Sequence, residues 1–429
     1  MSSKRKVLSD GSIYQKTTLP NGLRIVTEKI NSVRSISLGV WVDVGARNET
    51  PDENGVTHMI EHMLFKGTKK RSAFKISSEI ENLGGLLNAF TSREQTCYLA
   101  RVMYEHLDTA VDVLADLAQN ATLTPANLAK EKKVICEEIK ESLENPSDNV
   151  FDLFAKAYWG NHPLGQPILG SIETVSDMPR SRLVSYMKRN YKNNSVVISA
   201  SGAISHEKLV RLVKQKFRFS KGSAEPAPPA KRSRNSYVSV NPDGVSQTHV
   251  CIGLPGVNYV DRERTAALAV SSFLGGGMSS VLFQKIRENK GLAYSVYTYH
   301  ETYRDAGVFG TYLATHSRGL TQAVRILVDE CERLKKSRLS ITHMEQIKAQ
   351  LKGNLTLGME STSARMHRLA RQELVLGEYR SLDDTIKEIE KLTSTDILNL
   401  SNRIFDFSKV AVAVKGPADK KALENALQN

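Results

Sequence analysis

Cysteine is scarce in this chain, and the few cysteines form no recognisable pattern. Four cysteines occur among 429 residues, and no two stand as C-x-x-C. Disulfide-rich domains and cysteine-ligated zinc modules both need closely spaced cysteines, so reduced thiols are favoured. Long apolar runs are also missing: no stretch reaches the roughly 20 apolar residues that cross a bilayer, and residues 1–15 hold no apolar signal segment. We therefore expect a cytoplasmic protein without membrane insertion.

Acidic residues are outnumbered by basic ones, but the excess is not concentrated. There are 46 Asp and Glu against 59 Lys and Arg, a net charge of +13. The densest basic clusters, Lys69–Arg71 and Lys231–Arg234, contain no interleaved aromatic residues, which single-stranded nucleic-acid sites use for base stacking. The charge therefore predicts a solvated basic surface and no nucleic-acid partner.

Two histidines stand four residues apart in the segment GVTHMIEHMLFKGT, residues 55–68. Its apolar residues recur at helical intervals, which predicts a buried helix. On a helix, His58 and His62 project from one face a single turn apart, within reach of one metal ion. Glu61 lies beside them and could take a proton from a metal-bound water. This is the H-x-x-E-H pattern, the inverse of the H-E-x-x-H zinc-protease helix.

Catalytic zinc usually takes three protein ligands and keeps one position open, so the two histidines need a partner. The acidic run EKKVICEEIKESLE, residues 131–144, falls in a helix that we expect over about 126–143. Spacing alone leaves four candidates open, namely Glu131, Glu137, Glu138 and Glu141. A solvated charged helix face is the alternative explanation of such a run.

The clearest interruption of the chain is a segment rich in proline, small and charged residues at 221–235, which suits an exposed linker. We expect one domain over 1–220 and a second over 236–429. Both end in a strand, a glycine turn and an amphipathic helix, SVVISASGAISHEKLVRLVKQKF and KVAVAVKGPADKKALENALQN. We therefore predict an α+β fold of two homologous domains, each an antiparallel-rich sheet packed with helices.

The sequence resembles the pitrilysin family of inverted-motif zinc peptidases, which includes insulin-degrading enzyme and the processing peptidases. Matching segments run in the family's order over nearly the whole chain: LPNGLRIV, GVTHMIEHMLFKGT, GGLLNAFTSREQTCY, EKKVICEEIKE, HPLGQPILG and GGGMSSVLFQKIRENKGLAYSV. The family's V-I-x-x-E signature matches residues 134–138. The resemblance implies Glu138 as the third ligand of one zinc ion per chain. It also implies Glu131 as the residue that orients a histidine ligand, and Glu61 as the general base.

The implied activity is that of a zinc endopeptidase acting on short or unfolded polypeptides. Arg287 and Tyr294 match the pair with which the family stabilises the oxyanion. Asn88 and Ala89 match the segment that aligns the substrate. We expect an extended peptide to add to the edge of the strand near residues 96–102.

With two domains, the chain resembles the half-length branch of the family, whose members pair. We expect a homodimer in which Arg287 and Tyr294 complete the site of the other subunit. Two alternatives remain: a processing-peptidase β-type subunit that works with a different partner subunit, and a structural core subunit without catalysis. A scaffold has no physical need for intact His58, Glu61, His62 and Glu138, which argues against the second.

Overall fold

The computed structural model describes residues 2–233, 237–241 and 246–428, which form two compact units. The first unit takes its residues from 1–139, 167–228 and 357–381, and the second from 140–166, 229–356 and 382–429. Within the described ranges, no helix is both long enough and apolar enough to pass through a lipid bilayer.

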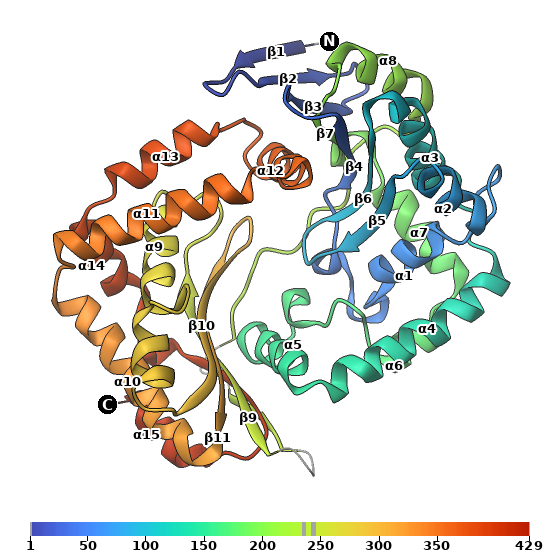
Figure 1. Ribbon diagram of the computed structural model, residues 1–429. Helices are drawn as coiled ribbons and strands as arrows, with labels where there is room; N and C mark the ends of the chain where they lie inside the picture. Colours follow the sequence, from blue (N-terminus) through green and yellow to red (C-terminus); the bar gives the residue numbers. More distant parts are fainter. Residues whose placement is uncertain (1, 234–236, 242–245, 429) are drawn as a thin grey trace. The chain divides into compact units, whose positions relative to one another are not determined.

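The first unit is built on a seven-stranded sheet with helices on both faces (Figure 1). Its strands are β1 (Ser2–Val7), β2 (Ile13–Thr18), β3 (Arg24–Lys29), β4 (Ser35–Val42), β5 (Leu86–Thr91), β6 (Thr96–Met103) and β7 (Val196–Gly202). They lie in the order β1-β2-β3-β7-β4-β6-β5. The β3–β7 pair is parallel and the other pairs are antiparallel.

The helices that pack in or begin in this unit are α1 (Val56–Leu64), α2 (Ala73–Glu81), α3 (Leu107–Asn120), α4 (Pro125–Glu144), α6 (Ile172–Asp177), α7 (Arg180–Asn190), α8 (His206–Lys216) and α12 (Thr362–Val375). The central strand β7 is buried along its whole length. Its residues alternate between two cores: Val196 and Ile198 belong to the core that includes residues of α1, α3 and α7, and Val197 to the core that contains α12. This two-sided burial explains why the residues of the strand other than Ser199 and Ser201 are apolar.

The second unit has a five-stranded sheet in the order β10-β11-β9-β12-β8. Its strands are β8 (Tyr237–Val240), β9 (Gln247–Gly256), β10 (Ala293–Thr302), β11 (Gly307–His316) and β12 (Ala411–Lys415). Its helices are α5 (Pro146–Trp159), α9 (Arg264–Gly275), α10 (Ser317–Lys336), α11 (Ile341–Gly358), α13 (Leu382–Lys391), α14 (Ser394–Ile404) and α15 (Lys420–Gln428), with a π-helical segment at Phe283–Glu288.

Five strands of the first sheet, all but β1 and β2, have the same arrangement as the five strands of the second sheet. The order β3-β7-β4-β6-β5 corresponds to β8-β12-β9-β11-β10, and in each sheet the first of these pairs is parallel. Gly202 is the last residue of β7 and Gly416 directly follows the equivalent strand β12, and both have φ near +120°. A Cβ on either would lie within 2.4 Å of the backbone oxygen of the residue that begins the neighbouring strand, so both turns require glycine. The predicted fold class, a duplicated α+β arrangement, is confirmed.

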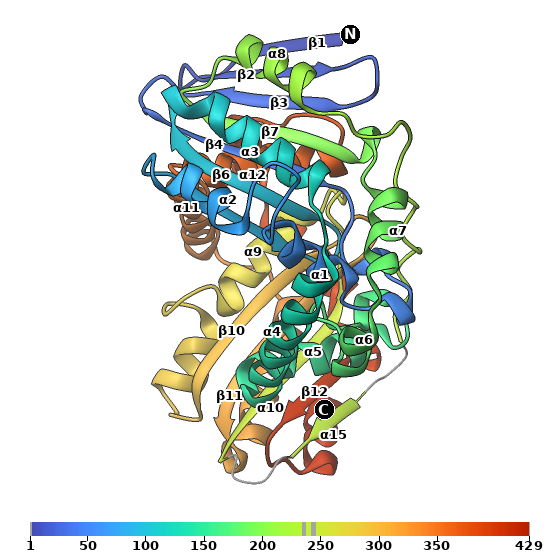
Figure 2. The same ribbon diagram turned by 90° about the vertical axis from the view of Figure 1, so that its right-hand side faces the viewer.

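Helix α12, from the second half of the chain, covers the first sheet (Figure 2). Met366 packs there beside Trp41, whose indole N–H lies 3.2 Å from the Met366 sulfur. Ser199 donates its hydroxyl to the Met366 carbonyl at 2.8 Å. The buried carboxylate of Glu373 pairs with Lys16 at 2.7 Å. These contacts tie α12 to the first sheet by both apolar packing and charge.

Helix α5, from the first half, covers the second sheet in the same way. Phe154 and Tyr158 pack against Cys251 and Tyr312. A Cβ at Gly253 would lie 2.1 Å from the Phe154 ring, so glycine makes room for it.

The unit boundary at 228/229 lies inside the predicted linker 221–235, but the compact units differ from the predicted ranges 1–220 and 236–429 because α5 and α12 are exchanged. An amphipathic helix covers whichever apolar sheet face it reaches, and this is a non-local outcome.

Candidate metal and peptidase site

A buried carboxylate holds the N-terminus of α1, the helix that carries H-x-x-E-H. Oε1 of Glu49 accepts the N–H of Thr57 at 2.8 Å, and Oε2 accepts the N–H of Gly55 at 2.9 Å and the side-chain amide of Asn54 at 3.1 Å. The first N–H groups of a helix have no intrahelical partners, so these bonds satisfy buried donors that would otherwise be unpaired. Burial raises the pKa of Glu49 to about 7. The start of α1 is thus fixed by its own protein contacts.

The structure brings together the two histidines of the H-x-x-E-H pattern and Glu138, the third ligand that the family resemblance implies. The rings of His58 and His62 lie with their centroids 4.6 Å apart. Helix α4 passes beside α1 (Figure 2) and brings a Glu138 oxygen to 3.6 Å from Nε2 of His62. One donor atom from each of the three residues lies within 4.8 Å of the other two. Glu137 and Glu141 are not part of this group among the described residues.

These donors suit a zinc ion. Burial, and the nearby His62, lower the pKa of His58 to about 4, so its ring is neutral at pH 7, the form that binds metal. Within the described part of the chain, Nδ1 of His58 is buried without a hydrogen-bond partner, as expected of a site built around an ion. Two imidazoles and one carboxylate are a donor set that catalytic zinc takes, with one position left open.

Glu131 lies beside one of the candidate ligands. Its Oε2 lies 3.1 Å from Nδ1 of His62, the ring nitrogen opposite the one that faces Glu138. Its Oε1 pairs with Lys66 at 2.9 Å, and the side chain is almost fully buried. Such a carboxylate fixes the tautomer and the ring orientation of a ligand histidine. Lys66, in the loop after α1, was not expected from the sequence, although it lies one turn beyond His62.

Glu61 lies on the same helix and accepts a hydrogen bond from outside it. The Thr91 hydroxyl, at the end of β5, donates to Oε2 of Glu61 at 2.6 Å. Burial raises the pKa of Glu61, and the bond from Thr91 and the nearby His62 oppose the rise. Sequence reasoning missed Thr91. The available signal was its position, three residues after Asn88, which the family resemblance places in the segment that aligns the substrate.

The strand beside this group is β5, and it is an edge strand. The predicted edge near residues 96–102 is wrong, because β6 pairs with β4 on one side and β5 on the other. The exposed edge therefore belongs to the strand that carries Asn88 and Ala89. The N–H of Ala89 donates to Oδ1 of Asn88 at 2.8 Å, in an exposed position.

Arg287 and Tyr294 belong to the second unit and lie together there. Arg287, in the π-helical segment, stacks on two aromatic rings, with its guanidinium carbon 4.7 Å from the Phe283 centroid and 5.5 Å from the Tyr294 centroid. Tyr294, near the start of β10, is 74% exposed. The pair thus presents a cation and a phenol on the surface of its own unit.

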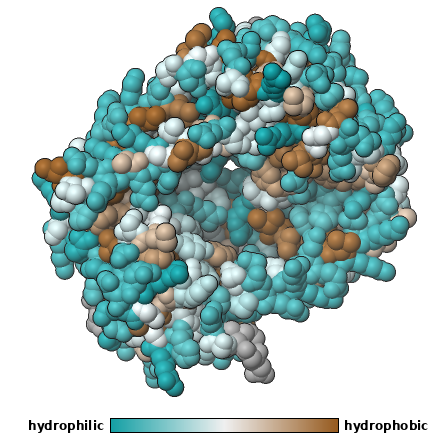
Figure 3. Space-filling view, viewed as in Figure 1, coloured by the Kyte–Doolittle hydropathy of each residue, from teal (hydrophilic) through white to brown (hydrophobic). Residues whose placement is uncertain are grey.

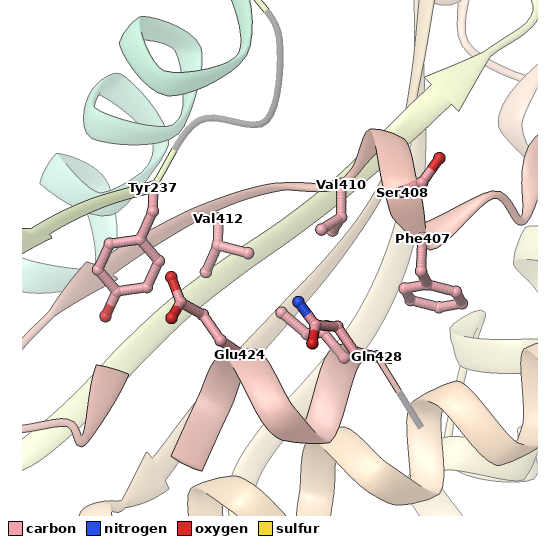
Figure 4. A pocket seen from close by; sticks show the side chains of 8 residues that line it. Tyr237, Phe407, Ser408, Val410, Val412, Glu424 and Gln428 are labelled. Atoms are coloured by element: carbon pink, nitrogen blue, oxygen red, sulfur yellow. The ribbon is translucent and has the colours of Figure 1, made fainter. Parts of the chain in front are cut away.

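A cavity of about 460 Å³ in the second unit offers a contrast. Its lining is mostly apolar, and Glu424, near Tyr237, is its one carboxylate among the described residues (Figure 4). It therefore lacks a metal-binding donor set. On the molecular face seen in Figure 3, hydrophobic residues form small separate groups among hydrophilic ones.

The chain matches two family descriptions. Residues 24–172 match the insulinase family of peptidases, M16, and residues 177–351 match the M16 inactive domain. The first match contains all of the candidate ligands.

Full-length similarity extends to bacterial proteins. An "uncharacterized zinc protease" of Streptomyces coelicolor is 39% identical over 95% of this chain and 91% of its own. One of Bacillus subtilis is 39% identical over 94% of this chain and 99% of its own. The crystal structure of a protease from Helicobacter pylori has the same fold, with a TM-score of 0.87 at 23% identity, covering 94% of this chain and 99% of that one.

Proposed function

The chain belongs to the insulinase family of peptidases, M16, and from this premise we propose that it is a zinc endopeptidase of the inverted-motif type. It is a metalloprotease with zinc as its cofactor, as the names of its relatives indicate. In our proposal His58, His62 and Glu138 hold the metal. The observation that carries the proposal is the clustering of their donor atoms within 4.8 Å beside Glu61.

A zinc ion bound at these ligands supplies a Lewis acid that polarises a peptide carbonyl and makes water more acidic. The remaining work falls to the protein. Glu61 takes the proton of the attacking water on a carboxylate oxygen and gives it to the departing amine nitrogen. Burial raises the pKa of Glu61, which makes its carboxylate a stronger base for the first of these steps. Glu131 keeps His62 in the tautomer that leaves Nε2 for the metal.

The substrate is an extended peptide that adds to the free edge of β5. Strand addition uses backbone hydrogen bonds, so many sequences are accepted provided that the segment is unfolded. In the free protein the Ala89 N–H donates to Oδ1 of Asn88. A backbone N–H on a strand edge is the group to which a carbonyl of an added substrate strand would bond. We propose that Asn88 turns away when the peptide binds.

Arg287 and Tyr294 act as donors to the developing oxyanion. Both are polar, close to each other and exposed, which leaves them accessible to a substrate. We propose that the chain forms a homodimer in which this pair serves the zinc site of the partner. Because one chain carries both parts, two copies suffice. A role beside a different catalytic partner, as in processing peptidases, and a purely structural role are the alternatives that experiment should separate.

The test is cleavage of a quenched-fluorescent peptide library by the purified protein, with and without a chelator. We expect cutting that the chelator abolishes and that Glu61→Gln reduces by at least about 10²-fold, with zinc still bound. Bound zinc without cutting would favour a missing partner subunit. A protein with neither zinc nor cutting would favour the structural role and contradict the proposal.

A further inference from the structure

The hydroxyl of Thr91 bonds to Glu61, the carboxylate that the proposed function makes the general base. It donates to Oε2 of Glu61 at 2.6 Å, a length typical of a strong bond from a hydroxyl to an ionised carboxylate. No second protein donor to Glu61 is found in the described part of the chain. Its orientation therefore depends on this contact.

We propose that Thr91 is a positioning residue that aims the Glu61 carboxylate for proton transfer. The inference rests on the proposed function, since it assigns a role within that reaction. Thr91 touches neither the metal ligands nor the substrate in this proposal. It acts by fixing Oε2, so that Oε1 remains available to the water and to the leaving amine.

The sheet fixes which way Thr91 points. Residues two apart on a strand share a face, and Leu87 and Ala89 pack against the core that contains α1. Phe90, between Ala89 and Thr91, packs on the opposite face beside Trp41. The Thr91 side chain therefore faces α1, and its β-branched form restricts rotation about χ1.

Among the described residues, the other neighbouring polar groups make no hydrogen bond to Glu61. The hydroxyls of Tyr98 and Tyr191 bond to each other at 2.8 Å. The Cys97 thiol is fully buried, and burial keeps the pKa of that thiol well above its usual range, so it is a weak donor. A Glu61 side chain without Thr91 would keep its partly buried setting but lose its fixed rotamer.

The position of Thr91 also connects base and substrate. Thr91 lies three residues beyond Asn88 on the strand whose free edge accepts the peptide. An added strand would order β5 along its length, including its end. Peptide docking and base orientation therefore share one element, and loss of the hydroxyl should impair the chemical step more than binding. A misplaced catalytic group costs up to about 10²-fold in rate.

The experiment compares Thr91→Val and Thr91→Ala, which both remove the hydroxyl, with Thr91→Ser, which keeps it. Thr96→Val is the matched control, because Thr96 pairs with Thr91 in the sheet but donates to the Val44 carbonyl instead. For each full-length protein, kcat, KM and the zinc content are measured on one fluorogenic peptide that the wild type cuts.

We expect both hydroxyl-free variants to lose about 10- to 100-fold in kcat, with KM within about twofold and zinc unchanged. Thr91→Ser should recover most of kcat, and Thr96→Val should keep it. An unimpaired Thr91→Val, a loss of zinc, or a serine variant as slow as the valine variant would overturn the positioning role. A wild type that neither binds zinc nor cuts any peptide would instead overturn the proposed function.

Discussion

The backbones of Gly55 and Gly170 pack so closely that a Cβ on either would lie 3.0 Å from the α-carbon of the other. Gly55 is the N-cap of α1, and Gly170 ends the segment HPLGQPILG. Both have φ near +85°, where a side chain is strained. Asn54 adds to this junction by donating its amide to the Pro167 carbonyl at 2.9 Å. The segment HPLGQPILG provides no metal ligand, but through this contact it supports the start of the helix that carries the H-x-x-E-H motif.

Gly170→Ala should therefore disturb the zinc helix. A Cβ would lie 2.8 Å from the Asn54 carbonyl oxygen, and we expect a loss of roughly 1–3 kcal/mol of stability together with weaker zinc binding. Gly11→Ala is the control, since Gly11 also has a positive φ but no atom within 4 Å of a Cβ. Unfolding midpoints and zinc titrations on both variants test this. Equal losses of stability and zinc affinity in the two variants would contradict a role of the Gly55–Gly170 contact in supporting the zinc helix.

Substitutions of the metal ligands should weaken zinc binding more than a substitution of Glu131, the carboxylate that supports His62. His58→Ala and Glu138→Ala each remove a donor, and we expect purified protein with little zinc. Glu131→Gln keeps all three donors but changes the partner of His62, and we expect about 10- to 100-fold weaker zinc binding. Competition with a chromogenic chelator measures all three. Full zinc affinity in Glu138→Ala would contradict the assignment of the third ligand.

A shared site predicts recovery of activity on mixing. Glu61→Gln and Tyr294→Phe should each be inactive or nearly so as homodimers. In a mixed dimer one of the two sites has both intact parts, so subunit exchange at equal amounts should restore about a quarter of the wild-type rate. Mass measurement of the exchanged species confirms that mixed dimers formed. Mixed dimers without activity would show that the pair does not act across the interface.

The buried carboxylate of Glu49 should make stability depend on pH. Its pKa is raised from 4.5 to about 7 by burial, so between these values the folded state holds more protons than the unfolded state. Its contribution is therefore complete below about pH 4.5 and is lost as the pH rises through 7. The side chain of Glu49→Gln does not titrate. Raising the pH from 4.5 to 7.5 should therefore lower the free energy of unfolding of the wild type relative to that of Glu49→Gln by at most about 3 kcal/mol.

Urea unfolding of the metal-free proteins at the two pH values measures this shift. Asp52→Asn, at an exposed position in the same loop, is the control. A difference between wild type and Glu49→Gln that stays constant with pH would contradict the raised pKa.

The local periodicity of the sequence was sufficient to predict several helices and strands of this molecule. The spacing of His58 and His62 predicts one helical face, and the helix expected over about 126–143 is α4, Pro125–Glu144. The strand, glycine turn and helix that end each half are β7 with α8 and β12 with α15. These features depend on neighbours within a few residues, where side-chain pattern and backbone geometry are directly linked.

The features that were missed depend on contacts between distant residues. Thr91 is 30 residues from Glu61, and threonine is common in strands for reasons of propensity alone. The edge position of β5 follows from the order of strands in the whole sheet. The exchange of α5 and α12 likewise could not be predicted from periodicity, because the apolar face of a helix carries no information on which sheet it packs against.

The exchange of these two helices has a consequence for the protein's synthesis. The ribosome completes β7 about 160 residues before it reaches α12. At roughly 5–20 residues per second, the sheet face that carries Trp41 waits on the order of 10–30 s for its cover. A nascent chain in this interval exposes an apolar sheet to solvent, so production of the protein should depend on chaperones that bind emerging β-rich segments, and a chain truncated before residue 362 should aggregate.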